Sequence, residues 1–165
     1  MRAALIDSSA LINLAHLELA SKLSRYFTVI YVPRRVQEEV NKKYRFRRRL
    51  NKLYRTGFFQ RCACADEGRV RLLTLGELDG GEAEGLVQAQ EKRAQFFIVD
   101  ERRARALGER QGLTPIGTVR ILARLCLEGD APDTDLLVRR LRKDLGFWVQ
   151  QKIVNEAVAA ASTPI

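Results

Sequence analysis

The sequence predicts an α/β fold in which helices cover both faces of a central parallel sheet, a three-layer α/β/α arrangement. Along the 165 residues, short segments of strand character alternate with segments whose apolar residues recur at helical spacing. The strand segments are almost continuously apolar, which is typical of strands buried on both faces of a parallel sheet. No repeat, low-complexity tract or linker rich in proline and serine interrupts the chain. We therefore expect one domain over residues 1–165.

Five segments have strand character. "AALID" and "FFIVD" are apolar runs that each end in an acid, and "TVIYV" is rich in β-branched and aromatic residues. "RVRLL" and "TPIG" are shorter candidates. The expected strands cover residues 3–7, 28–32, 69–73, 96–100 and 114–117.

Helices are expected between and after these strands. Pro33 is well placed to begin one, because proline is favoured in the first turn of a helix, and Gly112 is well placed to end another. The helix after Pro33 is expected to be long and basic, and the last three helices form a C-terminal layer. The expected ranges are 9–27, 34–55, 78–94, 101–112, 118–128, 134–145 and 149–161.

Composition excludes several classes of protein. No window approaches the ~18 uninterrupted apolar residues of a membrane-spanning helix, so we expect no membrane association. Three cysteines, an odd number without zinc-site spacing, suggest free thiols and a cytoplasmic protein. The sequence has neither a Gly-rich dinucleotide fingerprint nor a phosphate-binding P-loop. With His16 as its one histidine and no nucleophile elbow, a serine hydrolase is disfavoured, and we interpret His16 as structural.

Positive charge is concentrated in one segment. The net charge is +9, and residues 34–71 hold 13 Lys/Arg against 4 Asp/Glu, which is 13 − 4 = +9. A clustered basic surface is typical of polyanion binding, although a solvated helix face would have the same composition. Six residues at the centre of this segment are the candidate nucleic-acid contacts: Lys42, Lys43, Arg45, Arg47, Arg48 and Arg49.

Four acids follow the predicted strands in a way that suggests a site. Asp7 and Asp100 each close a strand, and Glu39 lies in the helix that follows the second strand. Glu82, at the start of a later helix, is the least secure of the four. Ligands of open parallel sheets bind at the carboxyl ends of the strands, so we expect these acids to converge there. For Asp7 alone, an ordinary helix cap is the competing interpretation.

Converging carboxylates must be protonated or neutralised. Two of them ~5 Å apart repel by about 3 kcal/mol at an effective dielectric near 20. Mg²⁺ or Mn²⁺ fits best, because these hard cations take oxygen ligands and keep bound waters for chemistry. We therefore expect a magnesium or manganese site.

Three stretches together resemble a known family. "LIDSSALINLAHL", "VIYVPRRVQEEV" and "GGEAEGLVQAQEKRAQFFIVDERRARALGERQGLTPIGTVRIL" are similar to the PIN-domain nucleases, above all to the VapC-like toxins with a "GEAE"-type third motif and a "GT" after the last strand. Each motif is weak, and their order and spacing are specific. The resemblance implies a PIN-like fold and metal-dependent endonucleolytic cleavage of RNA. It also implies a homodimer and a protein antitoxin as partner.

Residue roles follow from the resemblance by position. It implies catalytic roles for Asp7, Glu39, Glu82 and Asp100, with metal ligation by Asp7, Glu82 and Asp100. Ser9 is the polar neighbour of the first acid, Glu38 and Glu84 are the alternatives to Glu39 and Glu82, and Glu101 is accessory to Asp100. Asp7 then forms the floor of the site, and Ser8 or Ser9 is left to cap the helix.

Two departures from the family pattern keep other functions open. Residues 41–65 look like a basic helical insertion, and Arg120 and Arg124 follow "GT" where small residues or a single lysine are usual. The main hypothesis is a metal-dependent endoribonuclease, the toxin of a toxin–antitoxin pair. A non-catalytic RNA- or DNA-binding module with a basic arm is the alternative, and a third makes that arm a docking surface for an acidic protein. Five aromatic residues within the arm either stack on bases or pack against the domain: Tyr44, Phe46, Tyr54, Phe58 and Phe59.

Overall fold

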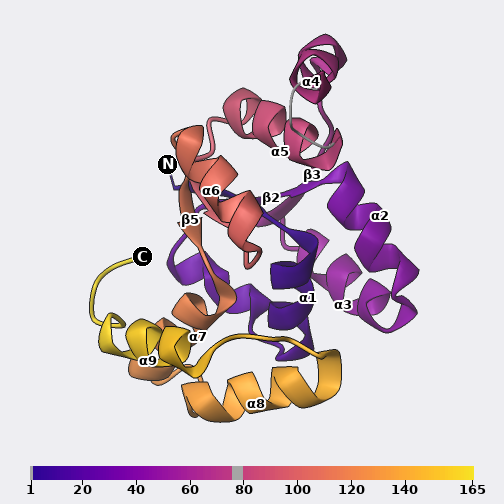
Figure 1. The fold of residues 1–165 in the computed structure, drawn as a ribbon. Coiled ribbons are helices and arrows are strands. Elements are labelled where there is room, and N and C mark those ends of the chain that lie inside the picture. The colour runs from indigo at the N-terminus through magenta and orange to yellow at the C-terminus, as the bar shows by residue number, and fades with distance from the viewer. Residues whose placement is uncertain (1, 76–79) are drawn as a thin grey trace.

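The computed structural model describes residues 2–75 and 80–165, and the side chains of residues 44, 45 and 80–82 lie outside the described part. A five-stranded parallel sheet forms the centre of the described chain, in the order β3-β2-β1-β4-β5. Helices cover both of its faces, which confirms the predicted three-layer α/β/α class (Figure 1). The strands are β1 (Ala3–Ile6), β2 (Val29–Pro33), β3 (Phe59–Cys62), β4 (Phe96–Ile98) and β5 (Thr114–Ile116).

The helices follow the predicted alternation with three changes. Their bounds are α1 (Ser8–His16), the 3₁₀ helix η1 (Ala20–Arg25), α2 (Arg34–Lys42), α3 (Tyr44–Tyr54), α4 (Glu67–Thr74), α5 (Gly80–Glu91), α6 (Arg102–Arg110), α7 (Thr118–Leu127), α8 (Thr134–Leu145) and α9 (Gln151–Ala159). The single helices expected over 9–27 and 34–55 are each two helices. The strand expected over 69–73 is wrong, because those residues belong to α4.

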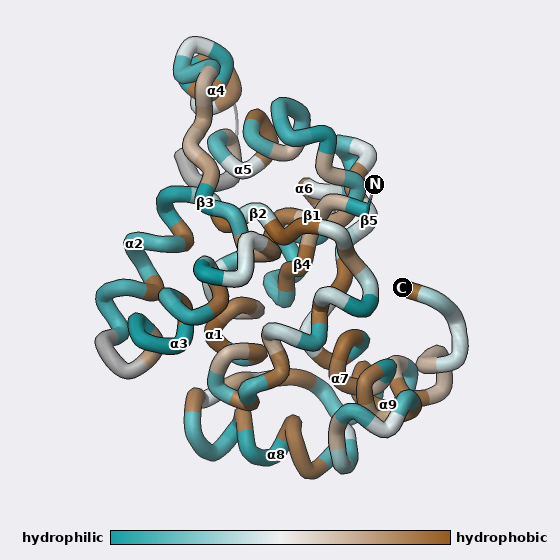
Figure 2. Tube along the Cα trace, turned by 180° about the vertical axis from the view of Figure 1, so that it is seen from behind, coloured by the Kyte–Doolittle hydropathy of each residue, from teal (hydrophilic) through white to brown (hydrophobic). Residues whose placement is uncertain are grey.

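Alternating residues of β1 separate two cores. Ala4 and Ile6 face the larger core, which contains residues of α1, α2, α3, α7, α8 and α9. Leu5 faces a smaller core that includes Ala89 of α5. In the tube of Figure 2, hydrophilic colour dominates α2, whereas β1 and β4 are largely hydrophobic. The sheet thus carries the core between two helical layers, and its carboxyl edge is where β1, β2 and β4 end.

The segment about 41–65, expected as a helical insertion, is helical over the last two residues of α2 and over α3. Its residues 59–62 form β3, which extends the sheet beyond β2. Phe46 and Leu50 of α3 are buried in the main core, so this segment is packed into the domain.

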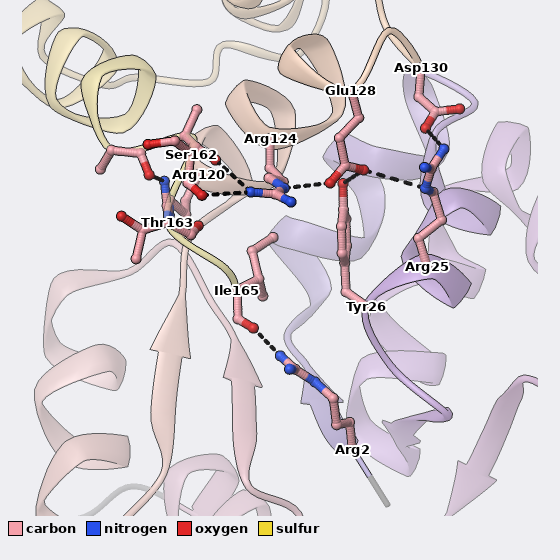
Figure 3. Close-up of polar contacts among 12 residues, drawn as sticks. Arg2, Arg25, Tyr26, Arg120, Arg124, Glu128, Asp130, Ser162, Thr163 and Ile165 are labelled. Atoms are coloured by element: carbon pink, nitrogen blue, oxygen red, sulfur yellow. Dashed lines mark hydrogen bonds and ion pairs between the residues drawn. The ribbon is translucent and has the colours of Figure 1, made fainter.

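The C-terminal layer is tied to the domain by polar contacts that account for the two unusual arginines after "GT". Arg120 donates to the carbonyl oxygens of Ala160 and Thr163. Arg124 donates to the carbonyl oxygens of Ala161 and Ser162, both at 3.0 Å, and to the Glu128 carboxylate at 2.5 Å. Figure 3 shows this chain of contacts reaching Tyr26, whose hydroxyl donates to Glu128 at 2.9 Å. Both arginines therefore bind the segment that follows α9, residues 160–163.

Candidate functional site

The fold brings Asp7 and Asp100 to the same edge of the sheet. Strands β1 and β4 are parallel neighbours, with Ile6 opposite Ile98. The backbone N–H of Asp7 continues this pairing and donates to the Ile98 carbonyl at 2.9 Å. Asp100 follows two residues after Ile98, so both carboxylates lie just beyond the carboxyl ends of two central strands.

Asp100 is held by three hydrogen bonds from two helices. Its Oδ1 accepts from the backbone N–H of Thr118 at 2.7 Å, and its Oδ2 accepts from the Thr118 hydroxyl at 2.6 Å. The amide of Asn13 on α1 donates to Oδ2 at 3.1 Å. Burial raises the pKa of Asp100 and the negative charge of Asp7 adds to that rise, while the bonds from Thr118 and Asn13 lower it. The net direction is upward, so Asp100 is a carboxylate that a cation would stabilise.

Asn13 and Thr118 are site residues that our sequence analysis did not assign. Both side chains are buried, at 4% and 0% exposed. A polar residue within the apolar stretch "ALINLA" and the threonine of "GT" are the available sequence features, and neither specifies a partner 87 or 18 residues away.

Asp7 has a local structural role in addition to its position. It is the N-cap of α1, and its Oδ2 accepts from the Ser9 backbone N–H at 3.3 Å and from the Ser9 hydroxyl at 2.6 Å. The expectation that Ser8 or Ser9 caps this helix is therefore wrong, because Asp7 does so itself. Ser9 does lie beside Asp7, as the sequence predicted for its polar neighbour.

A cavity of about 440 Å³ opens beside Asp7. Besides Asp7 and Ser9, its lining contains acids from three other elements: Glu39 of α2, Glu84 of α5 and Glu101 before α6. Glu84 is oriented by Gln88, a fully buried side chain whose amide donates to Glu84 at 2.9 Å. Arg35 contributes a positive charge to the same lining, and its Nε lies 3.7 Å from Oε1 of Glu39.

The remaining predicted acids lie differently. Glu38 is exposed and pairs with Arg34 at 2.9 Å, away from the cavity lining. Glu82 is in α5, and its side chain lies outside the described part of the structure. Among the side chains that are described, no three Asp, Glu, His or Cys residues are placed to hold one metal ion.

The six basic candidates occupy α2, α3 and the break between them. Lys42, Lys43, Arg47 and Arg48 are exposed, and the side chain of Arg45 lies outside the described part. Arg49 is engaged with the domain, because its guanidinium donates to the carbonyls of Ala15 and His16 and pairs with Glu18 at 2.9 Å.

The aromatic residues interleaved with these lysines and arginines serve mainly in packing. Phe46 and Phe59 are 1% and 2% exposed, which leaves no ring face for a nucleic-acid base. Tyr54 and Phe58 pack against the same core, and Tyr44 lies outside the described side chains. Of the two interpretations, packing holds for these four rings.

Taken together, the geometry defines an α/β domain with an acidic site at the carboxyl edge of its parallel sheet. The chain belongs to the PIN-domain family, whose model matches residues 3–163. PIN domains are generally nucleases, and they generally use divalent metals. No curated protein matches the chain.

Among solved structures, the chain is similar in fold to a toxin–antitoxin complex from Klebsiella pneumoniae. The two are 19% identical with a TM-score of 0.49, and the match covers 62% of this chain and 90% of that one. Within the residues described here, no helix has both the length and the apolar character needed to cross a membrane.

Proposed function

We propose that the protein is a metal-dependent endoribonuclease that hydrolyses RNA phosphodiester bonds. The observation that carries this proposal is the convergence of Asp7 and Asp100 at the ends of β1 and β4, next to a cavity lined by further acids. Membership of the PIN-domain family supports hydrolysis of nucleic acid. The basic surface of α2 and α3, with four exposed cations, supports a polyanionic substrate.

The residues present fit a magnesium or manganese ion. Mg²⁺ is commonly bound through one or two carboxylates with its remaining positions filled by water, and Asp7 and Asp100 supply two. The upward direction of the Asp100 pKa shows a charge that its surroundings only partly compensate. Glu82 is the proposed third ligand, on the basis of its position in the "GEAE" motif. A bound ion of this kind lowers the pKa of its water and stabilises charge on the phosphate under attack.

The chain's own residues divide the remaining work. Asn13 and Thr118 fix the orientation of Asp100, and Ser9 fixes that of Asp7. Glu39 faces the cavity, where it orients the attacking water, and Glu84 and Glu101 are accessory acids of the same wall. Lys42, Lys43, Arg45, Arg47 and Arg48 bind the RNA backbone beyond the cut. Arg49 contributes by holding α3 against the end of α1.

We further propose that the protein is the toxin of a toxin–antitoxin pair, acting as a homodimer in the cytoplasm. This part rests on the resemblance of its motifs to the VapC-like toxins. Co-expression with the protein encoded next to its gene tests it, since a cognate antitoxin should restore growth that the toxin alone arrests.

The alternative is a non-catalytic module that binds RNA or DNA through its basic arm. It would account for the exposed basic residues of α2 and α3 without requiring a metal site. Incubation of purified protein with labelled RNA, with and without Mn²⁺, separates the two. The nuclease should cleave only with metal, and Asp7→Asn should not cleave at all. Glu156→Gln on α9, which also removes one exposed carboxylate, is the matched control and should cleave like the wild type. Binding of RNA without metal-dependent cleavage would favour the alternative.

A further inference from the structure

A second cavity adjoins the acidic site along α1. Its volume is about 760 Å³, and it shares Ser9 with the first cavity. Asn13, which donates to Asp100, lies in its wall. Ser9, which donates to Asp7, and Asn13, which donates to Asp100, therefore connect this second cavity to both acids. The other lining residues come from α1, the break between α2 and α3, α8 and the loop after α8: Ile12, Lys43, Asp144, Leu145 and Phe147.

The wall of this second cavity combines three kinds of chemistry. Lys43 is an exposed cation at the break between α2 and α3. Ile12, Leu145 and Phe147 supply an apolar surface that includes one aromatic ring. Asp144, at the end of α8, supplies a carboxylate.

The carboxylate of Asp144 is fixed in place. Its Oδ2 lies 2.8 Å from Nε2 of His16 and 3.7 Å from Nε of Arg140. The hydrogen bond from His16 lowers the pKa of Asp144, which keeps this side chain an acceptor at neutral pH.

We propose that the second cavity is a nucleoside subsite for the RNA residue next to the scissile phosphate, and that it selects bases with an exocyclic amino group. This inference rests on the proposed function and names the substrate feature that the same site reads. Phe147 contacts the base, Lys43 pairs with the adjoining phosphate, and Asp144 accepts a hydrogen bond from the amino group.

The position of Asp144 supports this assignment on electrostatic grounds. A carboxylate in an RNA-binding surface repels the phosphates, so it is tolerable where the base edge meets the protein. Ionised carboxylates only accept hydrogen bonds, and cytosine, adenine and guanine each present an amino donor. Uracil presents carbonyl oxygens on both sides of its single N–H, and these would face the carboxylate with like partial charge. The cavity should therefore disfavour uracil.

The test compares decamers of cytidine and of uridine. Cytosine carries an amino group at carbon 4 and an unprotonated N3, whereas uracil carries a carbonyl oxygen at carbon 4 and an N–H at position 3. Their affinities are measured by fluorescence anisotropy in EDTA, where metal-dependent cleavage does not interfere. The wild type should bind the cytidine decamer about tenfold more tightly, which is the range expected for a hydrogen bond to a charged group. With Mn²⁺ added, kcat/KM for cleavage of the two decamers should differ in the same direction.

Variants locate the effect. Asp144→Asn should bring the ratio of affinities to about two or less, because an amide both donates and accepts. Asp135→Asn is the matched control: it lies on the same helix, also accepts a side-chain hydrogen bond (from Gln151, 2.7 Å), and does not line the cavity. Its ratio should equal that of the wild type.

Phe147→Leu keeps an apolar contact with the core and should weaken the binding of both decamers about tenfold, in line with the loss of one stacked base. Trp148→Leu removes the exposed neighbouring ring, which is not in the lining, and should leave both affinities unchanged.

Each outcome decides the matter. Equal affinities for the two decamers, an undiminished preference in Asp144→Asn, or no RNA binding at all would overturn the subsite. A cytidine preference that Asp144→Asn abolishes, in a protein that never cleaves with Mn²⁺, would support base selection by the second cavity and refute the nuclease. Cleavage without any preference would do the reverse. Thermal melting of Phe147→Leu, together with its cytidine-to-uridine ratio, shows whether a weakened variant is folded.

Discussion

Replacing Asp100 by asparagine tests whether a metal ion stabilises the carboxyl edge of the sheet. In the wild type, a buried carboxylate with a raised pKa faces the charge of Asp7. A cation bound there at ~100 times its dissociation constant stabilises the folded state by about 2.7 kcal/mol. For a domain of this size, that corresponds to a rise of about 5–10 °C in melting temperature.

Asp100→Asn should remove most of this response. The amide oxygen can still accept from the Thr118 backbone, which the carboxylate contacts at 2.7 Å, so the fold should survive. Without metal, the variant should melt at or above the wild-type temperature, because a buried charge and its repulsion with Asp7 are gone. The assay is thermal melting followed by circular dichroism, in EDTA and at several Mn²⁺ concentrations.

A control and two results make the test decisive. Glu156→Gln removes an exposed carboxylate that pairs with Lys152 at 3.8 Å, and it should keep the full Mn²⁺ response. An absent Mn²⁺ shift in the wild type would refute a metal site at this edge. An equal shift in wild type and Asp100→Asn would place the ion elsewhere on the protein.

Three further outcomes are expected. Asp7→Asn should abolish cleavage while RNA affinity, measured by filter binding, is kept or increased, because a negative charge near the phosphate is lost; weaker binding would contradict this. Replacing five cations of the arm by glutamine, namely Lys42, Lys43, Arg45, Arg47 and Arg48, should flatten the slope of log K against log salt by about 2. Single strands give a slope of about −0.7 per phosphate contact, and we expect about three contacts. An unchanged slope would remove the arm from RNA binding and leave the protein-docking interpretation. The stability difference between wild type and Glu128→Gln should be greatest near neutral pH. Burial raises the pKa of Glu128, but the hydrogen bonds from Tyr26 and Arg124 and the nearby arginine charges lower it by more, so the net shift of this pKa is downward. The stabilisation is therefore lost as pH falls through that lowered pKa. Melting curves between pH 7 and about pH 3 check this.

The sequence predicted the elements whose local pattern agrees with their final environment. Strands β1, β2 and β4 are apolar because both faces of the sheet are covered, and the last three helices keep one apolar face each. Residues typical of helix ends flank α8. Asp133 is its N-cap and accepts from the backbone N–H of Leu136 at 2.8 Å, and Gly146 follows the helix in the left-handed conformation. Where apolar pattern, capping residues and burial agree, a single sequence is sufficient to predict the element.

The segment 59–74 was misassigned because its local pattern and its environment disagree. β3 is an edge strand of four residues in which Gln60 and Arg61 face solvent, so it lacks the apolar run of its neighbours. "RVRLL" alternates like a strand, yet its Leu72 is 69% exposed in a helix without buried residues. The cap of that helix, Asp66, which accepts from the Arg69 N–H at 2.9 Å, is the feature that identifies it.

The break at Lys43 follows from the spacing of the buried residues on either side of it. Val36 and Val40 are one helical turn apart, and so are Phe46 and Leu50. From Val40 to Phe46, however, the six-residue step would place the second pair about 120° around a continuous helix of 3.6 residues per turn. All four side chains are in the main core. Only a change of direction between α2 and α3 allows this, and the backbone of Lys43 leaves the helical region there.

The acids were predicted more easily than the residues that hold them, and the reason is physical. An acid at the end of an apolar run conflicts with its surroundings, so Asp7 and Asp100 are visible in a single sequence. Asn13 and Thr118 satisfy hydrogen bonds within buried helical positions, where their residue types are unremarkable until the partner is known. Yet they determine what Asp100 can do. Burial alone would favour the protonated acid, and three donors shift the balance back toward the charged form that a cation requires. The metal site that we propose at this edge is thus defined jointly by one strand end and two helices that only the folded chain brings together.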